Sequence, residues 1–217
     1  MIHIQNNASK KLTLAIHSTD QSFGFAFREN KNKKSDHLFF RKFDNNLCNN
    51  LIVDFNKFIS KEDLKRVNKI SVSTGPANFN ASRLIVVFAR IISQQISCPL
   101  DSFSCFELMA KRIALRNNIS TNMNSFWIYK KLKRNGFIAG KYQIYIPNNQ
   151  KGDITIREQI IPSLLKELRD TEPNFQADYD DKKDLKELLT LSDKNSKIPN
   201  VNSWETVLPL YPLSPFN

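Results

Sequence analysis

Glycine is scarce in this chain, with 5 glycines among 217 residues. Loops that hold phosphates favour glycine, because a side chain blocks close approach of the backbone, so the few turns that keep a glycine are the ones to inspect. Long apolar runs are also missing: the longest, 84–89, is closed by Arg90 and is too short to span a bilayer. The first residues, MIHIQNNASKK, lack the apolar core of a signal peptide. We therefore expect a cytoplasmic protein with no membrane contact.

The few cysteines and histidines do not have the spacing of a metal site. Cys48, Cys98 and Cys105 are odd in number and form no CxxC pair, which argues against a disulfide framework and against zinc. The histidines show no HxxxH pair; they are His3, His17 and His37. A GxSxG elbow and a Ser-His-Asp order are also missing, so peptidase chemistry has no support. We expect packed, reduced thiols and neither metal nor cofactor.

Positive charge is in excess, with 32 Lys and Arg against 21 Asp and Glu, a formal charge of +11 and a pI near 9.6. Clustered cations attract phosphates, so one interpretation is a nucleic-acid or other acidic partner. The other is compositional drift in a genome rich in A and T, since Asn, Lys, Ile and Phe are enriched together. The two local clusters, 31–34 and 130–134, are expected at solvated hairpin ends.

The first half of the chain alternates short apolar runs with amphipathic stretches. Strands are predicted at 12–16, 23–27, 38–43, 70–73 and from Leu100, and helices at 46–60, 82–97 and 104–117, with a short extra turn at 63–67. The resulting order, β-β-β-α-β-α-β-α, predicts a mixed sheet that is antiparallel on one side and parallel where helices cross over. It is the arrangement of one lobe of the actin, Hsp70 and sugar-kinase ATPase fold, which is ribonuclease H-like.

The second half gives a weaker pattern. Strands are predicted at 126–129 and 142–146, helices at 160–168 and 184–191, and a polar, acidic loop at 170–181. The prolines of the tail, Pro209, Pro212 and Pro215, exclude a long helix there. We therefore predict an α/β protein of two lobes, 1–118 and 119–217, with the second lobe shortened.

The turn at 74–80, TGPANFN, joins a predicted buried strand to a helix start. A helix N-terminus offers free N–H groups, so this geometry can hold a phosphate. Only Gly75 remains of a glycine-rich version, and Ala77 and Ala81 carry Cβ atoms where a cradle would need none. The alternative is an ordinary turn in which Asn80 or Ser82 caps the helix.

Two segments now carry a family resemblance. LTLAIHSTDQSFGFAF, followed by VSTGPANFNASRLIVVFARIISQQISCPLDSFSCFELMA, resembles the TsaB (YeaZ) family, whose pattern is LAIDTS…VAL and then GPGSFTGLRIG. The resemblance covers 12–110; a strand–Gly–strand segment at 129–145 and LPLY at 208–211 extend it. It implies the non-catalytic subunit of the bacterial machinery for threonylcarbamoyladenosine at tRNA position 37, in a superfamily also called glycoprotease-like or M22 peptidase homologues. The implied partners are the catalytic paralogue TsaD and the ATPase TsaE.

Position by position, the resemblance points to an eroded nucleotide loop. Gly75, Pro76, Phe79 and Arg83 match the family motif, whereas the second and third glycines are alanines, and His17 stands where the family has Asp. We predict a degenerate nucleotide loop made of His17, Ser18, Thr19, Gly75, Pro76, Ala77, Asn78, Phe79 and Arg83. A lone His at a strand end is expected to be a satisfied polar residue rather than a base.

Two predicted helices have more apolar surface than one sheet contact requires. Ile52 and Ile59 on the first, and Ile85, Phe88 and Ile96 on the second, widen the apolar stripe. Surplus apolar surface suggests a partner, and the resemblance implies that the two helices pack against the matching pair of TsaD. The predicted partner-binding residues are Leu47, Leu51, Phe55, Phe58, Val87, Phe88, Ile91 and Ile92.

The sequence therefore favours a non-catalytic scaffold subunit that binds TsaD. Contact with tRNA within the complex and a homodimer in isolation stay open. Two alternatives belong to other classes. An ATP-dependent enzyme of the sugar-kinase type would need intact phosphate loops and metal-binding carboxylates, and a stand-alone basic tRNA-binding module would need a recognition motif that this sequence does not show.

Overall fold

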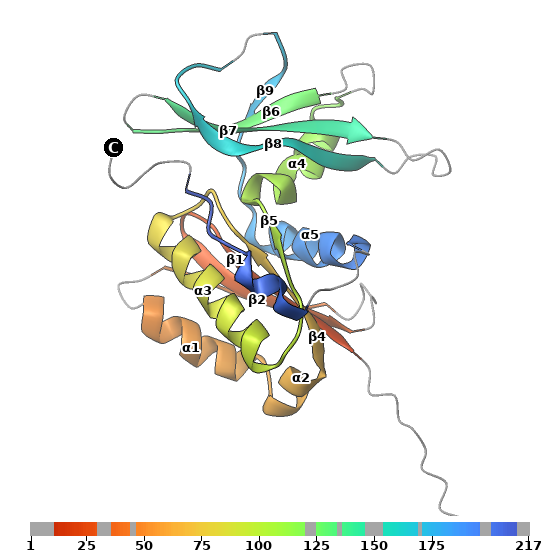
Figure 1. The fold of residues 1–217 in the computed structure, drawn as a ribbon. Helices are drawn as coiled ribbons and strands as arrows, with labels where there is room; N and C mark the ends of the chain where they lie inside the picture. The colour runs from red at the N-terminus through yellow and green to blue at the C-terminus, as the bar shows by residue number, and fades with distance from the viewer. Residues whose placement is uncertain are drawn as a thin grey trace, which may run out of the picture.

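A computed structural model describes residues 11–29, 36–43, 47–119, 125–133, 136–145, 154–168, 171–195 and 201–211. Two mixed β-sheets form two lobes, one above the other in Figure 1. The predicted class, an α/β fold with two lobes, is confirmed. Among the described residues, no helix is long and apolar enough to cross a membrane.

The larger sheet has the order β3-β2-β1-β4-β5. Its first three strands are antiparallel, and the last two run parallel to β1; the bounds are β1 Leu12–Ser18, β2 Ser22–Glu29, β3 His37–Lys42, β4 Val67–Ser73 and β5 Leu100–Phe103. This is the mixed sheet that the order of apolar runs predicted. Every position of β1 is buried, because helices cover both faces of the central strand.

The helices divide between the two faces of this sheet. Successive side chains of a strand point to opposite faces. Leu14 and Ile16 therefore belong to the core under α1 (Leu47–Phe58) and α3 (Phe79–Gln95), while Ala15 packs among leucines of α5 (Asp181–Lys194). A short helix, α2 (Lys61–Arg66), leads into β4. Figure 1 shows α1 and α3 side by side on one face and α5 on the other.

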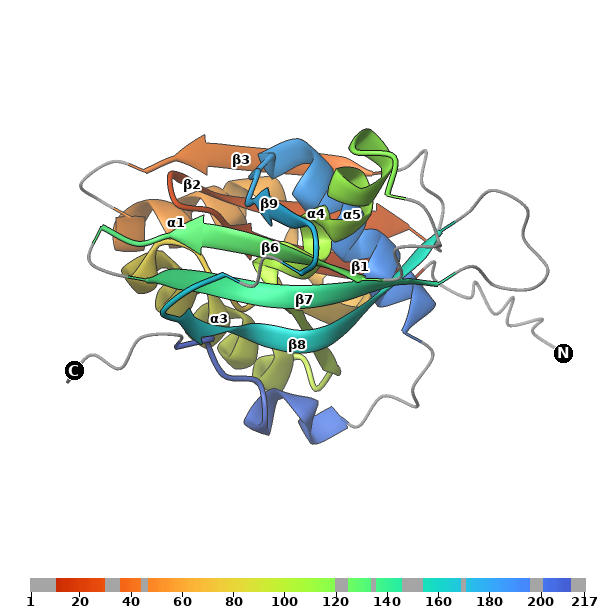
Figure 2. The same cartoon turned by 90° about the horizontal axis from the view of Figure 1, so that it is seen from above.

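The smaller sheet has the order β8-β7-β6-β9. Its strands are β6 Ser125–Lys131, β7 Phe137–Tyr145, β8 Thr155–Leu165 and β9 Asn174–Gln176. Helix α4 (Cys105–Arg116) covers one face and shares a core with it, made of residues such as Phe106, Met109, Phe126, Ile128 and Tyr142. The view from above in Figure 2 shows β6, β7 and β8 lying over the first lobe.

The helix predicted at 160–168 is wrong, because Ile160 to Leu165 complete strand β8. A short apolar run such as IIPSLL fits either period, but Pro162 has no N–H to give to a helix. The strand bulges at this point, since Ser163 pairs with Ala139 and Ile160 with Lys141. Gly140 lies opposite the bulge, where a Cβ atom would come within 2.9 Å of the Tyr142 hydroxyl. The loop predicted at 170–181 likewise contains the short strand β9.

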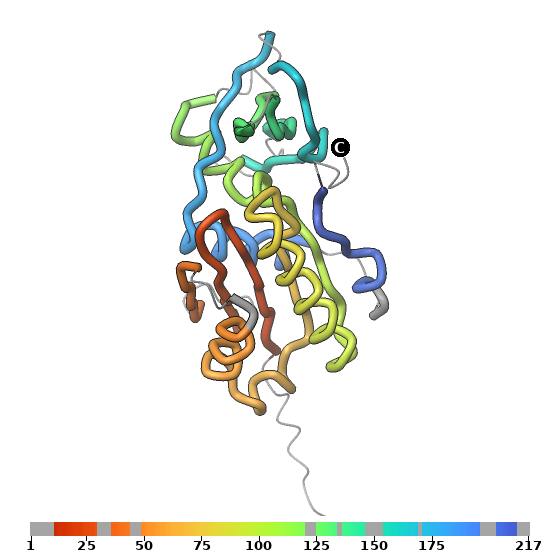
Figure 3. The backbone as a smooth tube through the Cα atoms, turned by 90° about the vertical axis from the view of Figure 1, so that its left-hand side faces the viewer, coloured from red at the N-terminus to blue at the C-terminus, as the bar shows by residue number. Residues whose placement is uncertain are grey.

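The chain returns to the first lobe after the second sheet. Helix α5 packs on β1 and β2, and the 3-10 helix η3 (Val201–Glu205) lies beside α3 and β5, as Figure 3 shows. The Leu100 N–H donates to Ser203 Oγ at 2.7 Å, and Val207 joins the core under α3. The division at residue 118 stays a prediction, but elements from both predicted segments build the first lobe.

Two of the three cysteines are buried, free thiols, Cys98 and Cys105. Burial raises the pKa of each thiol to about 12. Because the thiolate is the reactive form, these side chains act as packed apolar groups, as the sequence suggested. The side chain of Cys48 lies outside the described residues.

Arg28 is a buried cation that joins β2 to α5, and it generates the first prediction. Its guanidinium donates to Asp36 at 2.6 and 2.9 Å and to Asp193 at 2.7 Å, with 1% of the side chain exposed. Arg28→Ala leaves two carboxylates without their cation, so we expect the free energy of unfolding to fall by about 3 kcal/mol. Urea denaturation measures it.

Arg66→Ala is the matched control. Arg66 also bonds two carboxylates, those of Glu29 and Asp63, but at the surface. Exposed ion pairs contribute about 0–1 kcal/mol, so equal losses in the two variants would contradict a structural role for the buried cation.

Candidate functional site

The backbone N–H groups of the turn between β1 and β2 form hydrogen bonds within the turn itself. Thr19 Oγ1 accepts hydrogen bonds from the N–H groups of Gln21 (3.3 Å) and Ser22 (3.1 Å), and the Thr19 N–H donates to the Ser22 carbonyl at 2.8 Å. The two hydroxyls, of Thr19 and Ser22, are 2.6 Å apart. A phosphate at this turn would have to displace these bonds, because it needs the same N–H groups.

The structure brings the two predicted halves of the nucleotide loop together. The Ser18 N–H donates to Ser73 Oγ at 3.2 Å, and the Asn78 N–H donates to the Thr19 carbonyl at 3.4 Å. Arg83 does not join them; it is exposed on α3, with its guanidinium 5.4 Å from the centre of the Phe79 ring. The segments 17–19 and 75–79 of the predicted loop therefore lie next to each other in the fold, and Arg83 lies apart from them.

Helix α3 begins with its own cap. Asn78 Oδ1 accepts from the Ala81 N–H at 3.1 Å, so the predicted caps Asn80 and Ser82 are wrong. The helix starts at Phe79, one turn earlier than predicted, which puts both residues inside its first turn. The amide of Ala81 would face a bound anion in an open loop, and here a side chain already satisfies it.

Three segments hold the Gly75-Pro76 turn. The Gly75 carbonyl accepts from the Cys105 N–H at 2.6 Å, the Pro76 carbonyl accepts from the Tyr179 hydroxyl at 2.5 Å, and the Thr74 carbonyl accepts from the Leu210 N–H at 2.9 Å. Gly75 has a φ of +106°, a region that favours glycine. This requirement explains why the chain keeps this glycine while alanine occupies 77 and 81.

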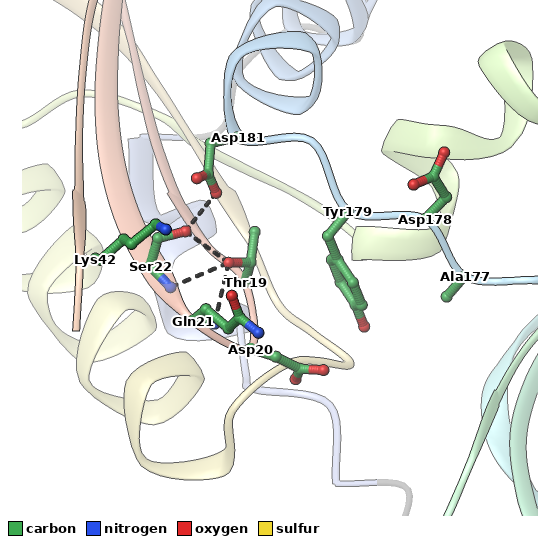
Figure 4. A pocket seen from close by; sticks show the side chains of 9 residues that line it. All are labelled: Thr19, Asp20, Gln21, Ser22, Lys42, Ala177, Asp178, Tyr179 and Asp181. Carbon is green, nitrogen blue, oxygen red and sulfur yellow. Dashed lines mark hydrogen bonds between the residues drawn. The ribbon is translucent and has the colours of Figure 1, made fainter.

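A cavity of about 280 Å³ opens beside the β1–β2 turn. Its lining, drawn in Figure 4, comes from the turn, β3 and the segment leading into α5: Thr19, Asp20, Gln21, Ser22, Lys42, Ala177, Asp178, Tyr179 and Asp181. The Ser22 hydroxyl donates to Asp181, which joins the two sides. Of the predicted loop residues, only Thr19 reaches this cavity.

The described lining includes three carboxylates and Lys42, and one of the carboxylates, Asp178, pairs with Arg116 at 2.6 Å. Lys130 of β6 pairs with Asp20 at 2.5 Å and so links the second sheet to the turn. The predicted solvated cluster at 130–134 therefore contributes a contact between lobes; its counterpart at 31–34 lies outside the described residues. Among the described residues, no three acidic, His or Cys side chains gather closely enough for a metal ion.

His17 points away from this cavity and into the layer between β1 and α5. Its side chain is buried, neither ring nitrogen has a hydrogen-bond partner among the described residues, and Nε2 lies 3.9 Å from Asp184 Oδ2. Burial lowers its pKa to about 3, so the imidazole is neutral. The expectation of a satisfied polar residue is wrong: His17 fills space as an uncharged ring.

Asp184 is the partner that the sequence did not reveal. It is fully buried on α5, where Oδ1 accepts from Arg112 Nη2 at 3.0 Å and Oδ2 accepts from the Asp180 N–H at 2.9 Å. Burial raises its pKa to about 7. The signal was a charged residue on the apolar face of the predicted helix at 184–191, next to Leu185 and Leu188.

Two half-buried acidic residues, Glu107 and Glu158, lie where α4 meets the smaller sheet. The hydroxyls of Ser104 and Tyr142 donate to Glu158 Oε1 at 2.6 and 2.9 Å. Burial raises the pKa of Glu107 to about 8, with a further contribution from the charge of Glu158. Ser104 also caps α4 by accepting from the Glu107 N–H, so this group fixes the helix against the sheet.

The predicted partner-binding residues fall into two sets. Leu51, Phe55 and Ile92 are buried and pack on the sheet, and Phe58 and Phe88 are half-buried; the side chain of Leu47 lies outside the described residues. Ile59 and Ile85, expected to widen the surface, are also buried. Four exposed side chains form what we call the α1/α3 face: Ile52 (56% exposed), Val53 (48%), Val87 (47%) and Ile91 (52%).

The His17–Asp184 pair generates a prediction about pH. Between about pH 4 and 6.5 the folded protein holds a proton on Asp184, whereas the unfolded chain holds one on His17, whose unperturbed pKa is 6.5. The two proton counts are equal, so the pair adds no slope to stability in this range. Each single variant removes one side of that balance.

In Asp184→Asn only the depressed pKa of His17 remains. The unfolded state then binds the extra proton, and stability relative to the wild type falls as the pH drops from 6.5, by about 1.4 kcal/mol per unit. In His17→Gln only the raised pKa of Asp184 remains, and relative stability falls as the pH rises from 4 to 7. Urea unfolding from pH 4 to 7 tests both predictions. If stability depends on pH in the variants as it does in the wild type, the two pKa shifts are contradicted.

Comparison with known proteins gives a fold without a close sequence relative. No protein-family model and no curated protein matches the chain. Two solved structures match it along nearly its full length. One, described as an uncharacterized protein with similarity to peptidase YEAZ from Pseudomonas aeruginosa, has a TM-score of 0.64 at 15% identity, covering 93% of this chain and 99% of the other. YeaZ from Pseudomonas aeruginosa gives 0.61 at the same identity and coverage. The chain has a YeaZ-like fold.

Proposed function

We propose that this protein is a non-catalytic scaffold subunit of the TsaB (YeaZ) type. It would bind the catalytic paralogue TsaD, with the ATPase TsaE joining the pair, in forming threonylcarbamoyladenosine at adenosine 37 of tRNA. The supporting observation is the match to YeaZ structures over 93% of this chain and 99% of theirs, together with the motif resemblance at 12–110. A full-length match supports a shared architecture better than a shared lobe would, because many functions use one such lobe.

The α1/α3 face is the proposed contact surface for TsaD. Phe55 and Phe88 pack edge to face at 5.0 Å, so the two helices form one continuous surface. On this surface the exposed side chains Ile52, Val53, Val87 and Ile91 would lose water on association. In isolation the same face is where two copies would pair.

The proposal that the subunit does not catalyse rests on the loops. The amides of Gln21, Ser22 and Ala81 already donate within the chain. A kinase-like site instead presents free N–H groups to phosphates. The basic composition supports tRNA contact within the assembly, where long-range attraction is sufficient.

Co-purification with TsaD from the same organism tests the proposed partner. We expect a stable complex with the wild type and at least tenfold weaker binding for Ile91→Asp, because a buried charge would replace an apolar contact. Ile161→Asp, on the edge strand β8, changes a similarly exposed isoleucine away from the α1/α3 face and should bind as the wild type does. No complex with the wild type would sink the proposal.

Isothermal titration with Mg–ATP tests the proposal that this protein is not an ATP-dependent enzyme. We expect no heat of binding at micromolar protein concentrations, since the turn amides are already bonded. Thr19→Ala removes the hydroxyl that accepts from the Gln21 and Ser22 amides. The heat measured for this variant is compared with that of the wild type. Micromolar affinity in the wild type would favour an ATP-dependent enzyme instead.

A further inference from the structure

A groove of about 480 Å³ runs between α4 and α5, on the side of the larger sheet opposite the α1/α3 face. The two helices lie near each other in Figure 2. Each contributes residues spaced i, i+3, i+4 and i+7, which is one helical face: Leu108, Lys111, Arg112 and Leu115 from α4, and Lys183, Lys186, Glu187 and Thr190 from α5.

The floor of the groove is apolar. Leu108 is buried at its base, and Leu115 lies at one end with 54% of its surface exposed. The stems of the lysines and Arg112 extend this apolar surface, since their methylenes can pack while the charged heads stay in water. An exposed leucine in a concave, helix-lined groove differs from an isolated surface leucine, because a ligand can enclose it.

The lining contains four basic side chains and one acid, Glu187, and acids just outside the lining pair with two of the four. Arg112 is held in place by the Asp178 carbonyl and the Asp184 carboxylate, at 2.5 and 3.0 Å. Lys183 pairs with Asp180 at 2.9 Å at the surface, where such pairs are weak and readily exchanged. The Lys186 ammonium makes no hydrogen bond or ion pair with another described residue.

We propose that this groove binds an amphipathic helix of a partner protein, with leucine-like anchors on one side and acidic residues flanking them. A helix that binds in an apolar groove contacts it through its own residues at i, i+3, i+4 and i+7. Lys186, together with Lys183 in its exchangeable surface pair, favours carboxylates on the bound helix. Nucleic acid fits less well, because phosphates gain nothing from Leu108 and Leu115. The groove is on the opposite side of the sheet from the proposed TsaD surface, so this inference goes beyond the proposed function and does not depend on it.

The probe is a fluorescein-labelled peptide of about 15 residues, long enough for a helix, with leucine at the four anchor positions and glutamate beside them. Anisotropy measures its binding to the full chain. A peptide of the same composition in scrambled order, and one with lysine in place of glutamate, should each bind at least tenfold more weakly. Equal binding of the scrambled peptide overturns the proposal.

Variants of the chain locate the site. Leu115→Asp and Lys186→Glu should each weaken binding about tenfold, a loss of about 1.4 kcal/mol. Their matched controls, Ile161→Asp and Lys182→Glu, change an exposed isoleucine on β8 and an exposed lysine of α5 outside the groove lining and should bind normally. Circular dichroism confirms that each variant folds.

Two outcomes separate the alternatives. If Lys186→Glu weakens the binding of peptide and of tRNA while Leu115→Asp affects neither, the surface is a general polyanion site and the helix proposal fails. If Ile91→Asp loses TsaD but keeps the peptide, the groove acts independently of the α1/α3 face. Loss of the peptide in Ile91→Asp would place it on the other side and overturn the assignment to the groove.

Discussion

The packing of α5 against β1 is the contact on which the rest of this structure depends. The helix comes from the end of the chain, yet its leucines Leu185, Leu188 and Leu189 form the core behind the first strand, with Ala15 and Ala26 beneath them. Small residues at these strand positions let the helix approach the sheet closely. The same helix carries Asp181 to the cavity and Lys186 to the groove. One apolar contact thus positions both polar surfaces.

This contact also accounts for the histidine at position 17. His17 shares the layer with Asp184, and an aspartate in its place would put two carboxylates together without solvent, which raises the free energy of the folded state. A neutral imidazole avoids that cost. The glycine at position 75 has a separate cause. Its φ is positive, a conformation that favours glycine whether or not a phosphate binds nearby. The residues at positions 17 and 75 therefore follow from packing and backbone geometry.

The first lobe was predictable from the sequence because its periods are unambiguous. The run at 12–16 is apolar throughout and suits a central strand, and helix α3 followed from apolar residues at helical spacing. Two kinds of information were missing elsewhere. At Pro162 the apolar run fits either period, and only its pairing with β7 decides for a strand. The partner of His17 lies on α5, far along the chain, and local patterns carry no information about such contacts. The cap at Asn78 was missed because the helix begins one turn before its first periodic residue.

The two sides of the larger sheet present surfaces of different composition. On one side, the α1/α3 face exposes the uncharged residues Ile52, Val53, Val87 and Ile91. On the other side, α5 and α4 form a groove lined by basic side chains. Association through an apolar surface becomes more favourable with the area buried and tolerates high salt. A charged rim contributes specificity, and its attraction for a partner weakens as salt is added. If both proposed contacts form, the α1/α3 face would hold one partner stably while the groove exchanged a second.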